Sequence, residues 1–169
     1  MGAALASRGL GLVYGGGNVG LMGILADAAL AHGAEVIGVI PEAMVEKELA
    51  HRGVTELRIV RSMHERKATM AELADAFVAL PGGYGTLEEF CEVLTWAQLG
   101  LHGKPCGLLN IEGFYAPFLA QIDRATQVRF IRPEHRTLLV VEEQANPLLD
   151  RLDEARPPAL HKWIDRDQA

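Results

Sequence analysis

Long apolar runs are missing from this sequence: no stretch of the 169 residues approaches the roughly 20 apolar residues that a membrane-spanning helix needs. The opening MGAALASRGLGLVYGGG also lacks the basic segment and following apolar segment of a secretory signal peptide. N-myristoylation favours serine or threonine at position 6, which is Ala6 here. We therefore expect no contact with a membrane and a cytoplasmic location.

Cysteine is scarce, and positive charge is outnumbered by negative charge. Cys91 and Cys106 fall within a predicted helix and a predicted strand, so we expect two buried free thiols in a reducing compartment. The net charge of −6 argues against a nucleic acid as a partner. It is compatible with a mononucleotide, because backbone N–H groups at a helix N-terminus can bind one phosphate.

Clusters of metal ligands are lacking as well. His64 and Glu65 do not form a zinc motif, because position 68 is alanine where the motif has a second histidine. We find no other spacing typical of a metal site and no nucleophile elbow. We therefore expect neither a metal nor another cofactor.

Short apolar segments alternate with longer segments of helical periodicity. The expected strands are 11–15, 35–40, 56–60, 76–80, 106–110 and 137–141. The expected helices are 18–33, 42–49, 63–74, 87–100, 114–126, 134–138 and a short one near 147–153. Strands that are apolar throughout are typical of parallel sheets with helices on both faces. The sequence thus predicts one Rossmann-like α/β domain over residues 1–155, followed by an extended tail at 156–169.

A first glycine-rich loop, GGGNVGLMG, begins at Gly15 between a predicted strand and a predicted helix. Gly15, Gly17 and Gly20 fit the G-x-G-x-x-G spacing of dinucleotide-binding loops. Glu42 follows at about the separation expected of a ribose ligand. The alternative is a tight turn whose backbone N–H groups face the carboxyl edge of the sheet. In either case, Gly16 and Gly17 are candidate substrate contacts.

A second glycine-rich loop, PGGYGT, also connects a predicted strand to a predicted helix. Both loops are therefore expected at the carboxyl edge of a parallel sheet, where open α/β sheets bind ligands. Two such loops favour a nucleotide monophosphate over a dinucleotide. No Walker-type lysine follows GGYGT, which argues against ATP hydrolysis. The expected substrate contacts in this loop are Gly82, Gly83, Tyr84, Gly85 and Thr86.

Glu89 admits two interpretations. Thr86 and Glu89 have the T-x-x-E spacing of a helix capping box, which would give Glu89 a purely structural role. At about 100° per residue, however, Glu88, Glu92 and Thr95 share one stripe of the helix, and Glu89 falls on its apolar side. A carboxylate on an apolar face beside a phosphate-binding loop is a candidate catalytic group.

A cationic candidate lies in the segment SMHERKATM. Ser62 and Glu65 have capping-box spacing, which predicts a helix beginning near Met63. Arg66 shares an apolar face with Met63, and a buried arginine requires an anion. Alternatively, the Arg66 side chain extends to solvent. Met63 and Lys67 flank Arg66 and are candidate substrate contacts.

Together these motifs resemble the Lonely Guy (LOG) family of cytokinin riboside 5′-monophosphate phosphoribohydrolases. The family signature PGGxGTxxE is matched over residues 81–89, and GGGNVGLMG, MHERK and LTWAQLG also match family segments. The resemblance covers roughly residues 5–155. Relatives with this signature are often labelled lysine decarboxylases, but the sequence shows no lysine in a pyridoxal-phosphate context.

The resemblance implies a catalytic pair, Arg66 and Glu89, with phosphate contacts from Gly83 to Thr86. It also implies nucleotide contacts from Glu48, Lys67 and Thr95. The reaction would hydrolyse the N-glycosidic bond of an N6-substituted adenosine 5′-monophosphate and release the free base and ribose 5-phosphate. No cofactor is implied.

The start of the chain differs from the family pattern. Family members usually begin with a further strand and a glycine-serine loop, whereas this chain starts within the helix that follows. We therefore expect the sheet to lack the family's first strand. A misplaced gene start, a truncated chain and a native difference are the alternative explanations.

The predicted helix 87–100 is apolar nearly all round, which one sheet face cannot cover. This pattern favours a homodimer through that helix, and the family is commonly dimeric. The alternative is burial under the C-terminal tail. Two other functions are also compatible with the glycine loops: a non-catalytic carrier of a nucleotide or molybdenum cofactor, and an NAD-dependent oxidoreductase.

Overall fold

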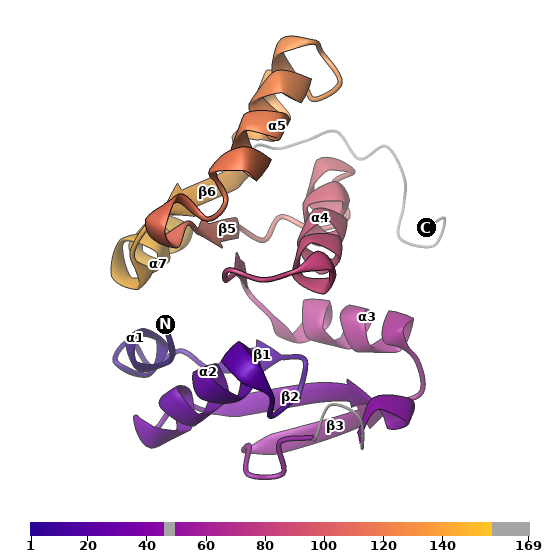
Figure 1. Cartoon of the computed structure of the whole chain (residues 1–169), viewed down its shortest axis with the longest axis vertical. Helices are drawn as coiled ribbons and strands as arrows, with labels where there is room; N and C mark the ends of the chain where they lie inside the picture. Colours follow the sequence, from indigo (N-terminus) through magenta and orange to yellow (C-terminus); the bar gives the residue numbers. More distant parts are fainter. Residues whose placement is uncertain (46–49, 157–169) are drawn as a thin grey trace. The chain divides into compact units, whose positions relative to one another are not determined.

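The structure is a computed structural model that describes residues 1–45 and 50–156 (Figure 1). The chain forms two compact units, Met1–Ala74 and Asp75–Ala169. Each unit contains a three-stranded sheet, and every paired strand in the described residues is parallel. The predicted Rossmann-like α/β class is confirmed. The assignment of residues 1–155 to one domain stays a prediction.

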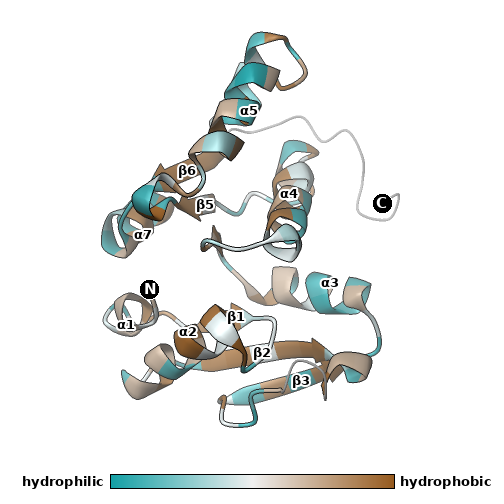
Figure 2. Ribbon diagram, viewed as in Figure 1, coloured by the Kyte–Doolittle hydropathy of each residue, from teal (hydrophilic) through white to brown (hydrophobic). Residues whose placement is uncertain are grey.

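The first unit is built around the strand order β1-β2-β3. Its elements are α1 (Gly2–Ala6), β1 (Leu12–Tyr14), α2 (Gly20–Ala31), β2 (Val36–Pro41), the 3-10 helix η1 (Glu42–Met44), β3 (Glu56–Val60) and α3 (Met63–Leu73). Val13 pairs with Ile37, and Val39 pairs with Arg58. The central strand β2 is almost entirely buried and is drawn mostly brown in Figure 2, because its sequence VIGVIP is apolar throughout.

The second unit has the strand order β4-β5-β6. Its elements are β4 (Phe77–Ala79), α4 (Tyr84–Gln98), β5 (Cys106–Leu109), the 3-10 helix η2 (Ile111–Gly113), α5 (Ala116–Gln127), α6 (Pro133–Arg136), β6 (Leu139–Glu142) and α7 (Ala145–Glu154). Val78, Gly107 and Val140 lie side by side across the three strands. Both units therefore repeat the same arrangement of sequential parallel strands.

The predicted strands are confirmed to within two residues at each end. The largest errors concern helices. The predicted helix 42–49 is a 3-10 helix over Glu42–Met44, and residues 46–49 lie outside the described residues. The predicted helix 87–100 begins earlier, at Tyr84. The part of the chain that the structure describes contains no helix long and apolar enough to cross a membrane.

The core of the first unit forms where α2 packs on the sheet. Ala26 and Ala29 are fully buried against Tyr14 and Val36. The short helix α1 crosses α2 closely, since a Cβ atom on Gly2 would lie 2.7 Å from the backbone nitrogen of Ala29. Small residues on both helices permit this approach and leave no room for larger side chains.

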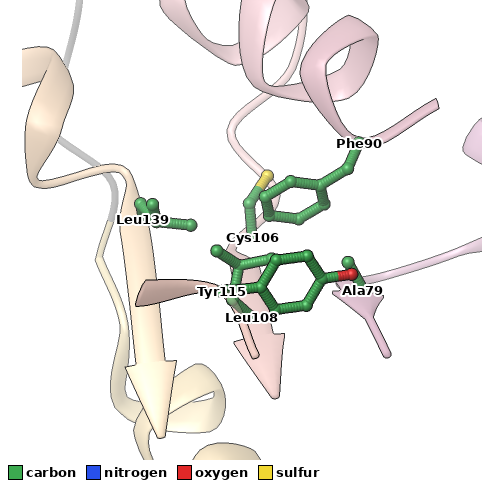
Figure 3. Packing of buried hydrophobic residues seen from close by; sticks show 6 residues of the cluster. All are labelled: Ala79, Phe90, Cys106, Leu108, Tyr115 and Leu139. Atoms are coloured by element: carbon green, nitrogen blue, oxygen red, sulfur yellow. The ribbon is translucent and has the colours of Figure 1, made fainter. Parts of the chain in front are cut away.

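The core of the second unit forms on both faces of its sheet. Cys106 and Leu108 contribute to one cluster with Phe90 of α4 and with Tyr115 (Figure 3). Gly107 points to the opposite face, where a Cβ atom would lie 3.0 Å from Leu148 of α7. Alternate residues of β5 thus face helices on opposite sides, as expected of a buried parallel strand.

One buried polar group in the first unit has no partner. Tyr14 is 5% exposed, and its hydroxyl makes no hydrogen bond with the described residues. Burial and the nearby Asp27 carboxylate raise the pKa of Tyr14 to about 12. Ionisation of Tyr14 in the folded protein is therefore unfavourable, because the phenolate would also lack a partner.

We predict that Tyr14→Phe leaves the free energy of unfolding unchanged or raises it by about 1 kcal/mol at neutral pH, because it removes an unsatisfied buried hydroxyl. The native pKa of Tyr14 lies above its unfolded value of 10.0. Its ionisation should therefore cost the wild type about 2 kcal/mol of stability between pH 10 and 12, a loss absent from the variant. Urea denaturation over this pH range tests both effects.

Tyr84→Phe is the matched control, because Tyr84 is 95% exposed. Its free energy of unfolding should match that of the wild type at neutral pH and should show the same loss between pH 10 and 12. A Tyr14→Phe protein that unfolds more easily at neutral pH would contradict the absence of a partner for this hydroxyl.

Candidate functional site

The first glycine loop, residues 15–23, lies directly against β2. Gly16 adopts φ +76°, a conformation that favours glycine. A Cβ atom there would also lie 3.2 Å from the backbone nitrogen of Val39. Gly38 of β2 is equally close, because its own Cβ would lie 2.8 Å from the Gly16 Cα. Both glycines are therefore needed for the close approach of loop and strand.

Arg66 of α3 is buried beside this loop, with 5% of its surface exposed. Its Nε donates to the Val39 carbonyl at 3.1 Å, and its Nη2 donates to the Gly15 carbonyl at 2.8 Å. These two carbonyl oxygens fix the orientation of the guanidinium, which carries only donors. The loop and β2 thus hold the Arg66 side chain in place, and the alternative of an arginine extended to solvent is wrong.

The start of α3 confirms the predicted cap. Ser62 Oγ accepts from the Glu65 backbone N–H at 3.1 Å, and the Glu65 carboxylate accepts from the Arg61 N–H at 2.8 Å. Met63 therefore occupies the first turn, where its sulfur lies 3.6 Å from Arg66 Nη1. Lys67 follows on the same turn and is half-buried. The first unit thus brings together Met63, Arg66 and the first glycine loop.

The second glycine loop, residues 81–86, leads into the N-terminus of α4. Gly83 is the N-cap, without a side-chain capping bond, and the Leu87 N–H donates to the Gly83 carbonyl at 3.1 Å. The N–H groups of Tyr84, Gly85 and Thr86 therefore have no acceptor within the helix. Gly83 and Gly85 are exposed, and nothing lies within 4 Å of where their Cβ atoms would be. Such a helix start is suited to an anion.

Two contacts fix the conformation of this loop. The Thr86 side chain folds back over Gly82, where a Cβ atom would lie 2.2 Å from Thr86 Oγ1. The Tyr115 hydroxyl donates to the Leu80 carbonyl at the end of β4, and Asn110 Oδ1 accepts from the Tyr115 N–H at 2.7 Å. Figure 3 shows the Tyr115 hydroxyl directed towards the Ala79 end of β4. Burial raises the pKa of Tyr115, so this donor stays protonated.

The predicted Thr86–Glu89 capping box is wrong. Because α4 starts at Tyr84, Thr86 is the third residue of the helix and cannot be its N-cap. Glu89 is half-buried at the end of the second turn, whereas Glu88 is exposed. The capping role that the sequence left open for Glu89 is therefore excluded, and its catalytic role stays a prediction.

Thr95 lies away from the second glycine loop. It follows Thr86 by nine residues, which at about 100° per residue places it on the opposite side of α4. Thr95 Oγ1 donates to the Cys91 carbonyl at 2.7 Å. Both residues line a cavity of about 140 Å³ whose walls also include Phe118 and Ile122 of α5. Glu48, another expected contact, lies outside the described residues.

The cysteines differ from expectation in one respect. Cys106 is buried as predicted, but Cys91 is exposed, because it lies on the same side of α4 as Glu88 and Thr95. Partial burial and the Glu88 carboxylate raise the pKa of Cys91. Burial raises the pKa of Cys106 to about 12. Among the described residues, no group of three or more His, Cys, Asp or Glu side chains could hold a metal ion.

Known proteins are similar in sequence to this chain over most of its length. The family model described as "Possible lysine decarboxylase" matches residues 22–152. LOG1 of Arabidopsis thaliana, a cytokinin riboside 5′-monophosphate phosphoribohydrolase, is 50% identical over 157 residues, which are 93% of this chain and 74% of that protein. The chain belongs to the Lonely Guy family. Its membership confirms the resemblance inferred from the glycine loops and MHERK.

Rice members of the Lonely Guy family are longer. The phosphoribohydrolase LOG of Oryza sativa subsp. japonica is 52% identical over 93% of this chain, which spans 65% of that protein. LOGL2 of the same plant, named a probable enzyme of this kind, is 50% identical, and the chain spans 64% of it. The chain therefore spans slightly less than two thirds of these two relatives.

A solved structure shares the fold of this Lonely Guy protein. The molybdenum cofactor binding protein from the phototrophic bacterium Rippkaea orientalis superposes with a TM-score of 0.64 at 21% sequence identity. The match covers 90% of this chain and 81% of the other. At this identity the similarity establishes a common fold.

Tyr115 and Asn110, which fix the second glycine loop, were not among the residues predicted from sequence. Asn110 follows directly after β5, at the carboxyl edge of the sheet, and a polar residue at that position is a recognisable signal. Tyr115 gave no comparable signal, because its partner carbonyl lies 35 residues earlier in the chain.

We predict that Gly15→Ala lowers the free energy of unfolding by about 1–3 kcal/mol, because overpacking displaces the buried guanidinium. The new Cβ atom would lie 1.9 Å from Arg66 Nη2. Urea denaturation measures the change. Gly103→Ala is the control, because nothing lies within 4 Å of its Cβ position. Equal stability of the two variants would contradict the position assigned to Arg66.

We predict that iodoacetamide alkylates Cys91 and spares Cys106 in the folded protein, because only Cys91 is exposed. Since the pKa of Cys91 is raised, its alkylation should be slower than that of free cysteine at pH 8 and should keep accelerating at higher pH. Peptide mass spectrometry against time gives both rates. Faster reaction of Cys91 than of free cysteine would overturn the direction of the shift.

Proposed function

We propose that the protein hydrolyses the N-glycosidic bond of N6-substituted adenosine 5′-monophosphates and releases the free base and ribose 5-phosphate. The observation that carries the proposal is the glycine-flanked N-terminus of α4, with exposed N–H groups suited to a phosphate and a half-buried carboxylate, Glu89, further along. Support comes from relatives named cytokinin riboside 5′-monophosphate phosphoribohydrolases, which are 52% and 50% identical to this chain over 157 aligned residues.

The proposed phosphate contacts are Gly82, Gly83, Tyr84, Gly85 and Thr86. The phosphate is remote from the glycosidic bond, so its binding energy can fix the ribose in a reactive position. Gly83 and Gly85 suit this role because an approaching anion meets no side chain there. A riboside without the phosphate should therefore be a poor substrate.

Glu89 is proposed to act on the reacting carbon. Cleavage of an N-glycosidic bond builds positive charge on the ribose, as in other glycoside hydrolyses. The Glu89 carboxylate would stabilise that charge and orient or deprotonate the attacking water. Breaking the C1′–N9 bond leaves the electron pair on the base, and water supplies its proton and the hydroxyl of ribose 5-phosphate.

Arg66 is the second proposed catalytic residue. Its guanidinium is held in a fixed position by hydrogen bonds to the Val39 and Gly15 carbonyls. It would either keep Glu89 ionised or contact the substrate directly. Met63, Lys67, Gly16, Gly17 and Thr95 are retained as proposed substrate contacts, on the strength of their positions in family motifs.

We further propose that the protein is a cytoplasmic homodimer. The support is the composition of α4, where half-buried apolar side chains occur on several sides of the helix. They are Leu87, Val93, Leu94 and Trp96. A second copy would cover those that the sheet of the second unit does not reach.

We predict base release from isopentenyladenosine 5′-monophosphate, little release from the riboside, and a fall of about 10²–10⁴-fold in kcat for Glu89→Gln. AMP binding, measured by calorimetry, should survive the substitution because the phosphate contacts are unchanged. Glu88→Gln is the matched control, since the neighbouring Glu88 carboxylate is exposed.

Binding of AMP without base release by the wild type would overturn the hydrolase proposal and indicate a nucleotide carrier. Undiminished turnover by Glu89→Gln would remove Glu89 from the reaction while leaving the substrate class intact.

A further inference from the structure

A buried histidine of the first unit contacts the first glycine loop. The His51 backbone N–H donates to the Gly16 carbonyl at 2.9 Å. The residue before it, Ala50, forms an antiparallel bridge with Gly17. His51 is 7% exposed, so Ala50 and His51 are held tightly against the loop.

The imidazole of His51 has a defined tautomer. Its Nδ1 lies 3.1 Å from the Gly53 backbone N–H, which can only donate, so Nδ1 carries the lone pair. Its Nε2 lies 2.9 Å from Asp27 Oδ1 and therefore carries the proton and donates to that carboxylate. Backbone and side chain together thus tie His51 to the loop, to its own turn and to α2.

Asp27 completes this arrangement from the helix that the loop opens. Its side chain is 68% exposed, so solvent stabilises the carboxylate while one oxygen accepts from His51. The loop leads into α2, which starts at Gly20. The hydrogen bond between Asp27 of α2 and His51 therefore links this helix to the residue that binds the Gly16 carbonyl. The loop is held at Gly16 by His51 and followed by the helix that orients His51.

The carbonyl next to the one bound by His51 holds Arg66. Gly15 accepts from Arg66 Nη2, and Gly16 accepts from His51. These carbonyls belong to consecutive residues, so a rotation of the chain at Gly16 would move both acceptors. Gly16 has φ +76° and no side chain to restrict such a rotation.

We propose that His51, oriented by Asp27, is a positioning residue that keeps the first glycine loop in the conformation in which the Gly15 carbonyl binds Arg66. The expected effect on turnover rests on the proposed catalytic role of Arg66. The effect on the position of Arg66 itself does not depend on that role.

The first test follows Arg66 without any substrate. The ¹⁵N–¹H NMR signal of Arg66 Nε–H, assigned with Arg66→Lys, reports the bond to the Val39 carbonyl. In the wild type this proton should exchange slowly with water. In His51→Ala it should shift and exchange at least about tenfold faster, because the loop no longer fixes the guanidinium. The imidazole ¹⁵N shifts of the wild type should show the Nε2–H tautomer.

The second test measures turnover of isopentenyladenosine 5′-monophosphate. His51→Ala should lower kcat by about 10- to 100-fold, the cost of a displaced catalytic group, and change KM by less than about threefold. Asp27→Ala should act in the same direction. Asp27→Asn should restore most of the rate, because the amide oxygen still accepts from Nε2–H.

His32→Ala is the matched control. His32 is an exposed histidine at the end of the same helix, with Nδ1 2.8 Å from the Ala28 carbonyl, and it should match the wild type in both tests. If His51→Ala fails to fold, the comparison of Asp27→Ala with Asp27→Asn decides the question.

A folded His51→Ala with unchanged Nε–H exchange and unchanged kcat would overturn the proposal. So would equal rates for Asp27→Ala and Asp27→Asn. If the wild type releases no base at all, the proposed function fails, and the exchange of Arg66 Nε–H still determines whether His51 positions that side chain.

Discussion

The hydrogen bonds from the Arg66 guanidinium to the Gly15 and Val39 carbonyls are the constraint on which the first unit depends. They require a glycine at position 15, because any Cβ would occupy the guanidinium's place. They also require the loop to lie against β2, which in turn demands glycine at 16 and 38. The Arg66 side chain is thereby buried and oriented by backbone carbonyl groups of the loop and of β2.

The glycine loop of the second unit differs from that of the first in the groups that it presents. The first unit supplies a fixed side-chain charge, whereas α4 supplies backbone N–H groups at a helix start flanked by glycines. Tyr115 and Asn110 stabilise the strand end from which this helix departs. Each unit thus carries one part of the proposed chemistry, and each part is supported by residues outside the family motifs.

The sequence predicted elements governed by local patterns. Apolar runs located the strands, and Ser62 with Glu65 located the start of α3 correctly. Local patterns failed at Thr86. The T-x-x-E spacing suggested that Thr86 is the N-cap, whereas α4 begins at Tyr84 with Gly83 as its N-cap. The hydrogen bond between Asp27 and His51 was beyond prediction, since 24 residues separate the partners and neither stands in a distinctive pattern.

The absence of a side-chain cap on α4 has a thermodynamic consequence. At an N-cap, glycine stabilises a helix less than serine or aspartate does, by about a few tenths of a kcal/mol. A bound anion would occupy the place of that cap, so folding and ligand binding are linked through the same N–H groups. The ligand-free protein is then less stable at the residues proposed to bind the phosphate, a trade-off between stability and function common to working sites.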